Sequence, residues 1–225
     1  MAEIFQRYEK KYLLDTKQYS YISELLGKYM NHDKFYKTRV NSIYYDTDNY
    51  QLIRRSIEKP EYKEKLRIRT YGDIDDDEKV FVELKKKYDG IVYKRRTRSV
   101  YKDVLNNIYD CRFEDEQIGS EIRYALNYYD HLKPAYFISY LRTSYVANDD
   151  RNIRITFDQD IRYRHNHLSL HSEKDDEIIT DKIIMELKVN DSIPLWLSHI
   201  LNEVKVYPQG FSKVGSAYLK ELMEV

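Results

Sequence analysis

The sequence predicts an α+β protein built on a closed, eight-stranded antiparallel β-barrel with helices packed outside it. Several short segments alternate between apolar and charged residues, as half-buried strands do. Between them lie segments whose apolar residues recur at helical spacing. The chain has 225 residues, 42% of them hydrophobic, which suits one domain over residues 1–225 with a substantial core.

Alternation predicts the strands. In Lys65–Arg69 every second residue is charged and the residues between are apolar, so the two sets lie on opposite faces of a sheet. The pair Asp89-Gly90 indicates a tight turn between neighbouring strands. The expected strands span residues 7–12, 38–46, 65–69, 79–85, 92–98, 135–146, 154–158 and 184–189.

Apolar stripes and capping residues predict four helices. Asp15 with Gln18 is typical of a helix start, and the apolar stripe that follows runs as far as Met30. Pro194 suits the first turn of a later helix, and Ser212 is a candidate cap for the last. The four helices are expected over residues 15–30, 118–129, 194–204 and 212–223.

The charged face of the expected sheet is mostly basic. With Lys213 included it holds twelve cations and four carboxylates, although the whole chain has 38 basic and 38 acidic residues. An open sheet with one solvated face also produces a charged face, but such faces usually mix the two signs. A buried basic face needs water and a polyanion to be stable. A closed barrel with a basic lumen is therefore favoured over the solvated sheet.

Three Glu-x-Lys pairs fall on this basic face. A spacing of two puts both side chains on the same face, about 7 Å apart along the strand. A carboxylate placed in this way can hold a divalent metal while the lysine meets phosphate oxygens, although salt-bridged strand surfaces give the same pattern. The pairs are Glu9 with Lys11, Glu83 with Lys85, and Glu186 with Lys188.

Seven stretches together resemble a known family. They are residues 7–12 (Arg-Tyr-Glu-Lys-Lys-Tyr), 42–47, 65–69, 81–85, 151–158, 185–188 and 210–213. In these stretches, which run in order through nearly the whole chain, the sequence resembles a VTC domain. VTC domains are the polyphosphate polymerase branch of the triphosphate tunnel metalloenzyme (CYTH-like) superfamily. The resemblance implies an eight-stranded tunnel, ATP as phosphate donor, Mn²⁺ or Mg²⁺ as cofactor, and inorganic polyphosphate as product.

The resemblance and the basic face together assign the site residues. The expected catalytic residues are Lys11, Arg67, Arg69, Lys85 and Arg154. The expected phosphate-binding residues are Arg7, Lys65, Lys94, Arg96, Arg142, Lys188, Ser212 and Lys213. Glu186 resembles the metal ligand of the family, and Glu9 and Glu83 are the further metal candidates.

The first strand favours the polymerase branch of the superfamily. Its triphosphate hydrolases open with Glu-x-Glu-x-Lys, whereas this chain has Arg7-x-Glu9-x-Lys11. The leading hypothesis is transfer of the ATP γ-phosphate to a growing polyphosphate chain. The alternatives are a metal-dependent tripolyphosphatase or nucleoside triphosphatase, and a non-catalytic polyphosphate sensor. Charge placement serves all three equally.

The remaining features concern partners and location. The expected partners are ATP and inorganic polyphosphate or triphosphate. No RNP-type aromatic motif accompanies the tyrosines, so no nucleic acid is expected. No apolar run reaches the roughly 18 residues of a membrane helix, and residues 1–5 do not resemble a signal peptide. Cys111 is the single cysteine, which favours a reducing, cytoplasmic location.

Overall fold

A computed structural model of the chain describes residues 8–89, 91–129, 131–171, 173, 176–190 and 192–224. Arg7, an expected phosphate-binding residue, and Gly90 of the expected turn lie outside the described residues. The chain divides into two compact units. Unit 1 comprises Met1–Arg39, Tyr140–Ile161 and Thr180–Phe211, and unit 2 comprises Val40–Ser139, Arg162–Ile179 and Ser212–Val225. One domain over the whole chain stays a prediction.

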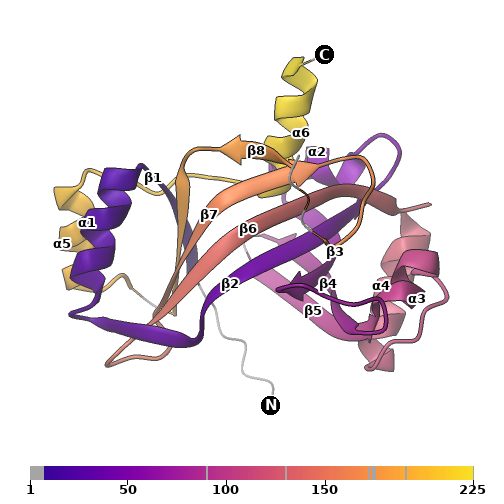
Figure 1. Ribbon diagram of the computed structural model, residues 1–225, viewed down its shortest axis with the longest axis horizontal. Helices are drawn as coiled ribbons and strands as arrows, with labels where there is room; N and C mark the ends of the chain where they lie inside the picture. The colour runs from indigo at the N-terminus through magenta and orange to yellow at the C-terminus, as the bar shows by residue number, and fades with distance from the viewer. Residues whose placement is uncertain are drawn as a thin grey trace. The chain divides into compact units, whose positions relative to one another are not determined.

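The described residues form nine strands and six helices (Figure 1). The strands are β1 (Tyr8–Leu14), β2 (Met30–Asp46), β3 (Tyr62–Tyr71), β4 (Lys79–Tyr88), β5 (Ile91–Val100), β6 (Lys133–Ala147), β7 (Arg154–Arg164), β8 (Glu177–Thr180) and β9 (Ile183–Val189). The helices are α1 (Thr16–Leu26), α2 (Gln51–Glu58), α3 (Tyr101–Asn107), α4 (Glu116–Tyr128), α5 (Leu195–Glu203) and α6 (Lys213–Glu224).

The strands form one antiparallel sheet in the order β1-β9-β7-β6-β2-β3-β4-β5, with β8 paired to β7. The prediction of a closed eight-stranded barrel is wrong, because β1 and β5 end this order and no pairing joins them in the described part of the chain. Alternation determines which residues share a face. Closure depends on strand tilt and stagger, which alternation does not specify. The α+β class is confirmed, with the sheet open.

All eight expected strands are present and longer than predicted, and all four expected helices are present, the first of them shorter than predicted. Asp15 caps α1 as predicted, since its Oδ1 accepts a hydrogen bond from the Gln18 backbone N–H (2.8 Å) and Gln18 Oε1 accepts one from the Asp15 N–H (3.0 Å). The expected extension of this helix to Met30 is wrong, because α1 ends at Leu26 before Gly27 and Met30 begins β2. Met30 is buried, but it is buried as a residue of β2 and not as part of the helix.

The sequence analysis missed β8 and two helices of unit 2. Helix α3 has seven residues and β8 has four, too few to show a clear period. The first turn of helix α2 is bound by Asp46, at the end of β2 and not at the N-cap position: the buried carboxylate accepts hydrogen bonds from the backbone N–H groups of Leu52 (2.9 Å) and Ile53 (2.7 Å). Burial raises the pKa of Asp46 above its ordinary value.

Unit 1 has its own hydrophobic core. Figure 1 shows α1 and α5 side by side, and the two helices are in contact. Ile22 and Leu26 of α1 and Leu197 of α5 are buried together with Phe157 and Leu187. Because Phe157 and Leu187 belong to the apolar sets of their strands, the helices cover the face of the sheet that the alternation predicted to be apolar.

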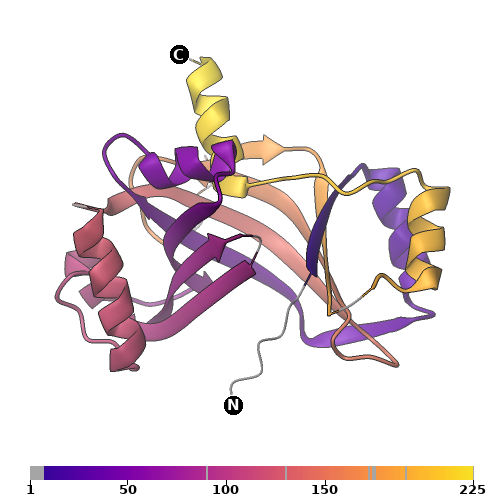
Figure 2. The ribbon, with the colours of Figure 1, turned by 180° about the vertical axis from the view of Figure 1, so that it is seen from behind.

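Unit 2 has a second core of the same design. Helices α3 and α4 contact β5, and α2 contacts α6, as Figure 2 shows from behind. Leu66 and Val82 of the sheet are fully buried with Ile122 and Leu126 of α4.

No helix of the described residues is both long and apolar enough to cross a membrane.

Candidate functional site

In unit 2 the charged side chains of β3, β4 and β5 form rows across the sheet. Each row joins residues that lie directly opposite one another on neighbouring strands. The rows are Lys65–Lys85–Lys94, Arg67–Glu83–Arg96 and Arg69–Phe81–Arg98. Like charges directly opposite one another destabilise a sheet. A row of three lysines is therefore a feature that an anion would stabilise.

Glu83 is the carboxylate at the centre of these rows. Its side chain is 1% exposed, and it meets Arg67 Nη2 at 2.7 Å, Arg69 Nη1 at 3.9 Å, Lys94 Nζ at 2.8 Å and Arg96 Nη2 at 2.5 Å. Burial alone would raise the pKa of Glu83, but the positive charges of Arg67, Arg69 and Lys94 hold it well below its ordinary value. We refer to Lys65, Arg67, Arg69, Glu83, Lys94 and Arg96 as the Glu83 cluster.

Two residues of β2 extend this cluster. Arg67 donates from Nη1 to the Tyr44 hydroxyl (2.9 Å), and Arg69 donates from Nε to Ser42 Oγ (3.0 Å). Both hydroxyl residues lie opposite their arginine in the strand register. The sequence analysis missed them because it counted only charged residues. The alternation of residues 42–46 already places Ser42 and Tyr44 on one face.

Tyr44 lies in an unusual electrostatic environment for a phenol. Its side chain is buried beside the Glu83 cluster. Burial alone would raise the pKa of Tyr44, but the positive charges of Arg67, Arg69 and Lys65 outweigh burial and lower it to about 7. Near neutral pH the Tyr44 hydroxyl therefore lies close to the midpoint of its titration.

The beginning of α6 adds a hydroxyl to the Glu83 cluster. Lys65 donates from Nζ to Ser212 Oγ (3.0 Å), and the same oxygen accepts the Gly215 backbone N–H (3.2 Å). Ser212 therefore caps α6 as predicted, and Lys213 is the first residue of the helix. A Cβ at Gly215 would lie 3.1 Å from Ile57 Cγ1 and 3.1 Å from Ser212 Oγ, which explains the glycine next to the cap.

In unit 1 a second charged cluster lies on β1, β9, β6 and β7. Lys11 is opposite Glu186, and Glu9 is opposite Lys188. Lys188 Nζ meets Glu186 Oε1 at 2.7 Å, whereas Lys11 Nζ lies 3.7 Å from Glu9 Oε1 and donates to the Phe211 carbonyl (3.2 Å). We refer to Glu9, Lys11, Arg142, Asp158, Glu186 and Lys188 as the Glu186 cluster.

The Glu186 cluster is balanced in charge, with three cations and three carboxylates. Arg142 donates from Nε and Nη2 to both oxygens of Asp158 (2.6 and 2.8 Å). Burial alone would raise the pKa of Glu186, but Lys188, Arg142 and Lys11 hold it well below its ordinary value. Glu186 is therefore an ionised carboxylate that is almost entirely buried.

The carboxylates of the two clusters differ in their fit to a divalent metal. Among the described residues no group of three or more His, Cys, Asp or Glu side chains is placed to hold a metal ion by itself. Glu9 and Glu186 are diagonal neighbours on adjacent strands of one face, and one or two carboxylates with phosphate oxygens are a usual Mg²⁺ environment. The oxygens of Glu83 are engaged by guanidinium and ammonium groups instead.

The other expected site residues occupy separate positions. Arg154 lies opposite Lys188 on β7, but its Nη1 is 3.8 Å from Asp33 Oδ2 and its Nε donates to the Arg151 carbonyl (3.4 Å). Half-buried Lys85 belongs to the lysine row described above. Catalytic and phosphate-binding roles for these residues stay predictions.

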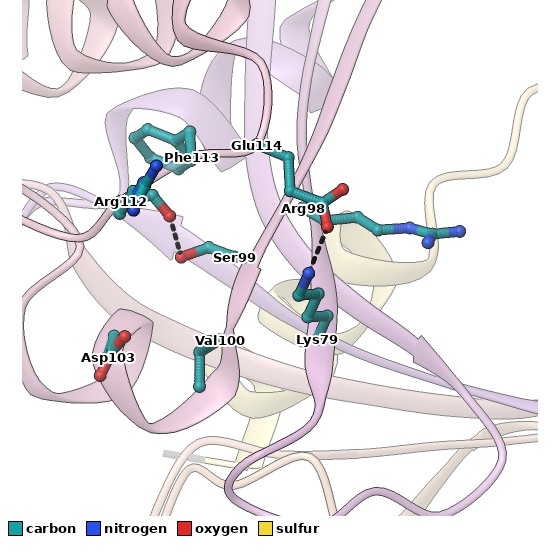
Figure 3. A pocket seen from close by; sticks show the side chains of 8 residues that line it. All are labelled: Lys79, Arg98, Ser99, Val100, Asp103, Arg112, Phe113 and Glu114. Carbon is teal, nitrogen blue, oxygen red and sulfur yellow. Dashed lines mark hydrogen bonds and ion pairs between the residues drawn. The ribbon is translucent and has the colours of Figure 1, made fainter.

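A hollow of about 400 Å³ lies where β5 ends, beside α3 and the segment that leads to α4. Figure 3 shows two of its interactions: Lys79 donates to Glu114 (2.7 Å), and Ser99 Oγ donates to the Arg112 carbonyl (2.7 Å). None of the expected site residues is among those that line this hollow. The predicted site residues therefore lie away from this hollow.

Comparison with known proteins places these features in context. The family model described as VTC domain matches residues 6–220 of the chain. None of the curated proteins matches the chain. Among solved structures, the PH1819 protein from Pyrococcus horikoshii OT3 is similar over 97% of this chain and 99% of that chain, with 16% sequence identity and a TM-score of 0.47.

Proposed function

This chain belongs to the VTC domain family, and from that premise we propose that it is a polyphosphate polymerase that transfers the γ-phosphate of ATP to inorganic polyphosphate. Family membership supports a polyphosphate-related function. The observation that carries the finer proposal is the row Lys65–Lys85–Lys94 together with Arg67, Arg69 and Arg96. These three arginines and Lys94 share the single carboxylate of Glu83. This arrangement suits a chain of phosphate groups.

The Glu83 cluster supplies orientation as well as charge. Arg67 donates to Glu83 from Nε (2.8 Å) and to Tyr44 from Nη1 (2.9 Å), so its guanidinium plane is fixed before a ligand arrives. A planar guanidinium can grip two phosphate oxygens at once, whereas an ammonium group acts as a point charge. Arg67 and Arg69 would therefore hold phosphate groups in defined orientations.

The reaction needs no side-chain nucleophile and no general base. The terminal phosphate of the acceptor is already an anion, and it attacks the γ-phosphorus of ATP as the bond to the leaving ADP breaks. Catalysis of phosphoryl transfer rests on alignment and on neutralising the charge of the transferred group. Arginine and lysine side chains provide both effects.

Glu186 and Glu9 would hold the divalent cation, Mn²⁺ or Mg²⁺. The ion would neutralise phosphate charge when bound, and phosphate oxygens would complete its shell. Glu186 suits the task because it is ionised, and because Lys188, its close partner, can turn from the carboxylate to a phosphate oxygen. Glu83 instead serves to position the arginines around it.

A product assay tests the proposal. The purified chain is incubated with ATP and Mn²⁺, and the products are resolved on a polyphosphate gel together with measurement of ADP and orthophosphate. We expect ADP together with a ladder of long phosphate chains. Orthophosphate released in step with ADP, without a ladder, would establish hydrolysis, and tight triphosphate binding without either product would establish a sensor.

Two variants connect the assay to the proposed site. Arg67→Gln should abolish the ladder because it removes a guanidinium that holds phosphate. Arg95→Gln is the matched control, because Arg95 lies next to Arg96 on the other face of β5 and pairs with Glu121 at 3.0 Å. Equal activity of the two variants would place phosphate binding away from the Glu83 cluster.

A further inference from the structure

Tyr44 contacts Arg67 of the Glu83 cluster, but the transfer reaction described above gives it no role. Its hydroxyl accepts a hydrogen bond from Arg67 Nη1 (2.9 Å), and the Arg67 guanidinium carbon lies 5.6 Å from the centre of its ring. The residue is only 7% exposed. Tyr44 is thus a buried phenol held against a residue that we expect to bind phosphate.

The charges that face Tyr44 are mostly positive. Three cations come from β3: Lys65, Arg67 and Arg69. On β4, the carboxylate of Glu83 is paired with Arg67. On β2 itself, the carboxylate of Asp46 accepts backbone N–H groups of α2. An ionised Tyr44 would therefore serve as a second anion of the Glu83 cluster while no ligand is bound. Its environment lowers the pKa of Tyr44 to about 7, so ionisation is accessible at neutral pH.

A polyanion reverses this balance. Phosphate groups held by Arg67 and Arg69 place negative charge beside the phenolate oxygen of Tyr44. Because a nearby like charge disfavours the charged form of an acid, the bound phosphate favours protonation of Tyr44. Once protonated, the hydroxyl can donate a hydrogen bond to a phosphate oxygen, which a phenolate cannot do.

From this geometry we infer that Tyr44 is a phosphate-contacting residue that takes up one proton from solvent when a polyphosphate chain binds. The inference rests on the proposed function and adds a coupling between chain binding and pH. By linkage, affinity is highest where Tyr44 is already protonated and falls as pH rises above 7. With one proton taken up, the fall approaches about tenfold per pH unit.

Neighbouring Tyr45 is a matched control. It lies on the opposite face of β2, in the core of unit 2, and its buried hydroxyl has no hydrogen-bond partner among the residues that the structure describes. Burial raises the pKa of Tyr45 far above neutrality, so it stays protonated throughout. Tyr44→Phe and Tyr45→Phe remove the same atom from adjacent positions and leave the packing volume nearly unchanged.

The test measures binding without turnover. Long-chain polyphosphate is titrated into wild type, Tyr44→Phe and Tyr45→Phe in an isothermal calorimeter at pH 7, 8 and 9, in two buffers of different ionisation enthalpy. We expect wild type and Tyr45→Phe to take up close to one proton at pH 8 and to lose tyrosinate absorbance at 295 nm on binding. Tyr44→Phe should bind without that proton and show a flatter pH dependence.

The outcomes separate this inference from the proposed function. Wild type that binds polyphosphate with no proton uptake at pH 8, or a Tyr44→Phe variant that takes up the same proton as wild type, overturns the role of Tyr44 and leaves the proposed function standing. A wild type that binds no polyphosphate at any of these pH values overturns both.

Discussion

The Glu83 cluster and the Glu186 cluster share a sequence motif but differ in the charges that surround it. The central glutamate of each belongs to a Glu-x-Lys pair on one face of a strand. In unit 1, Glu186 pairs with Lys188, the lysine of its own motif, at 2.7 Å. In unit 2, Glu83 meets four cations, all from the neighbouring strands β3 and β5. Cross-strand neighbours therefore decide what the motif does.

The resulting charge balance differs accordingly. The Glu83 cluster has five cations and one carboxylate, whereas the Glu186 cluster has three of each. A surplus of positive charge suits an anion and a carboxylate that is already neutralised. A balanced group leaves carboxylate oxygens that can exchange a lysine for a metal ion. On the proposed function, the first cluster would orient phosphate and the second would bind the metal.

The largest expected effect comes from Glu83→Gln. The substitution keeps the shape but leaves four cations around a neutral amide, and removing one partner from a buried ionic group costs about 3–5 kcal/mol. For a chain of this size, at about 2–4 °C per kcal/mol, we expect the melting temperature to fall by roughly 6–20 °C at pH 7. Glu9→Gln, at a side chain 28% exposed, should shift it much less. Equal shifts would contradict the central role of Glu83.

The pH dependence of this difference follows from the direction of the shift. The surrounding cations hold the pKa of Glu83 well below its ordinary value, so the stability that Glu83 adds is fully present above the unfolded pKa of about 4.3 and is lost as pH falls through the folded pKa. The gap in unfolding free energy between wild type and Glu83→Gln should stay constant from pH 7 to 5 and narrow below about pH 4. Urea denaturation at each pH measures it.

A second substitution separates the clusters by activity. Glu186→Gln removes the charge that would hold the metal, so we expect turnover at limiting Mn²⁺ to fall about 100-fold, comparable to the loss of a group that stabilises the transition state. The fold should persist, because the cluster keeps Glu9 and Asp158. ADP release measured against Mn²⁺ concentration checks this, with Glu177→Gln, which contacts Tyr163 and Lys220, as the control. Unchanged turnover at limiting Mn²⁺ would assign the metal to Glu9.

A smaller effect is expected from Arg67→Lys. The charge is kept, but the fork that donates to both Glu83 and Tyr44 is lost. Orientation should suffer more than affinity, so we expect kcat to fall about tenfold with KM nearly unchanged. Steady-state kinetics with ATP check the split between the two constants, with Arg95→Lys as the control. A rise in KM alone would show that Arg67 supplies charge only.

Much of this comparison could be predicted from the sequence. Alternation placed Arg67, Glu83 and Lys188 on the charged face and Leu66 and Val82 under the helices, because a strand has only two faces. Alternation could not predict closure, since whether β1 meets β5 depends on tilt and stagger along the whole sheet.

The ion-pair partners of each charged residue could not be predicted from the sequence either. Arg67 and Glu83 are sixteen residues apart, and their contact depends on the register of the β3–β4 pair. A shift of that register by one residue would move Arg67 to face Val82 or Leu84. Tyr44 was visible in the alternation, but its closeness to three cations also follows from strand pairing. Spacing alone therefore found the members of each cluster but not their partners.

The smallest expected effect, that of Lys188→Gln on metal affinity, tests most directly whether the Glu-x-Lys motif itself determines metal binding. Lys188→Gln removes the partner of Glu186 and frees its carboxylate, so metal binding no longer competes with an ion pair. A pair whose lysine is 33% exposed contributes about 0.5–1 kcal/mol, and we therefore expect Mn²⁺ affinity to rise about twofold to fivefold. Lys85→Gln, the same change in the other motif, should leave Mn²⁺ affinity unchanged, because Glu83 keeps its four cations. Calorimetric titration of both variants with Mn²⁺ decides the matter: an equal gain in both would mean that the motif, and not its neighbours across the sheet, determines where the metal binds.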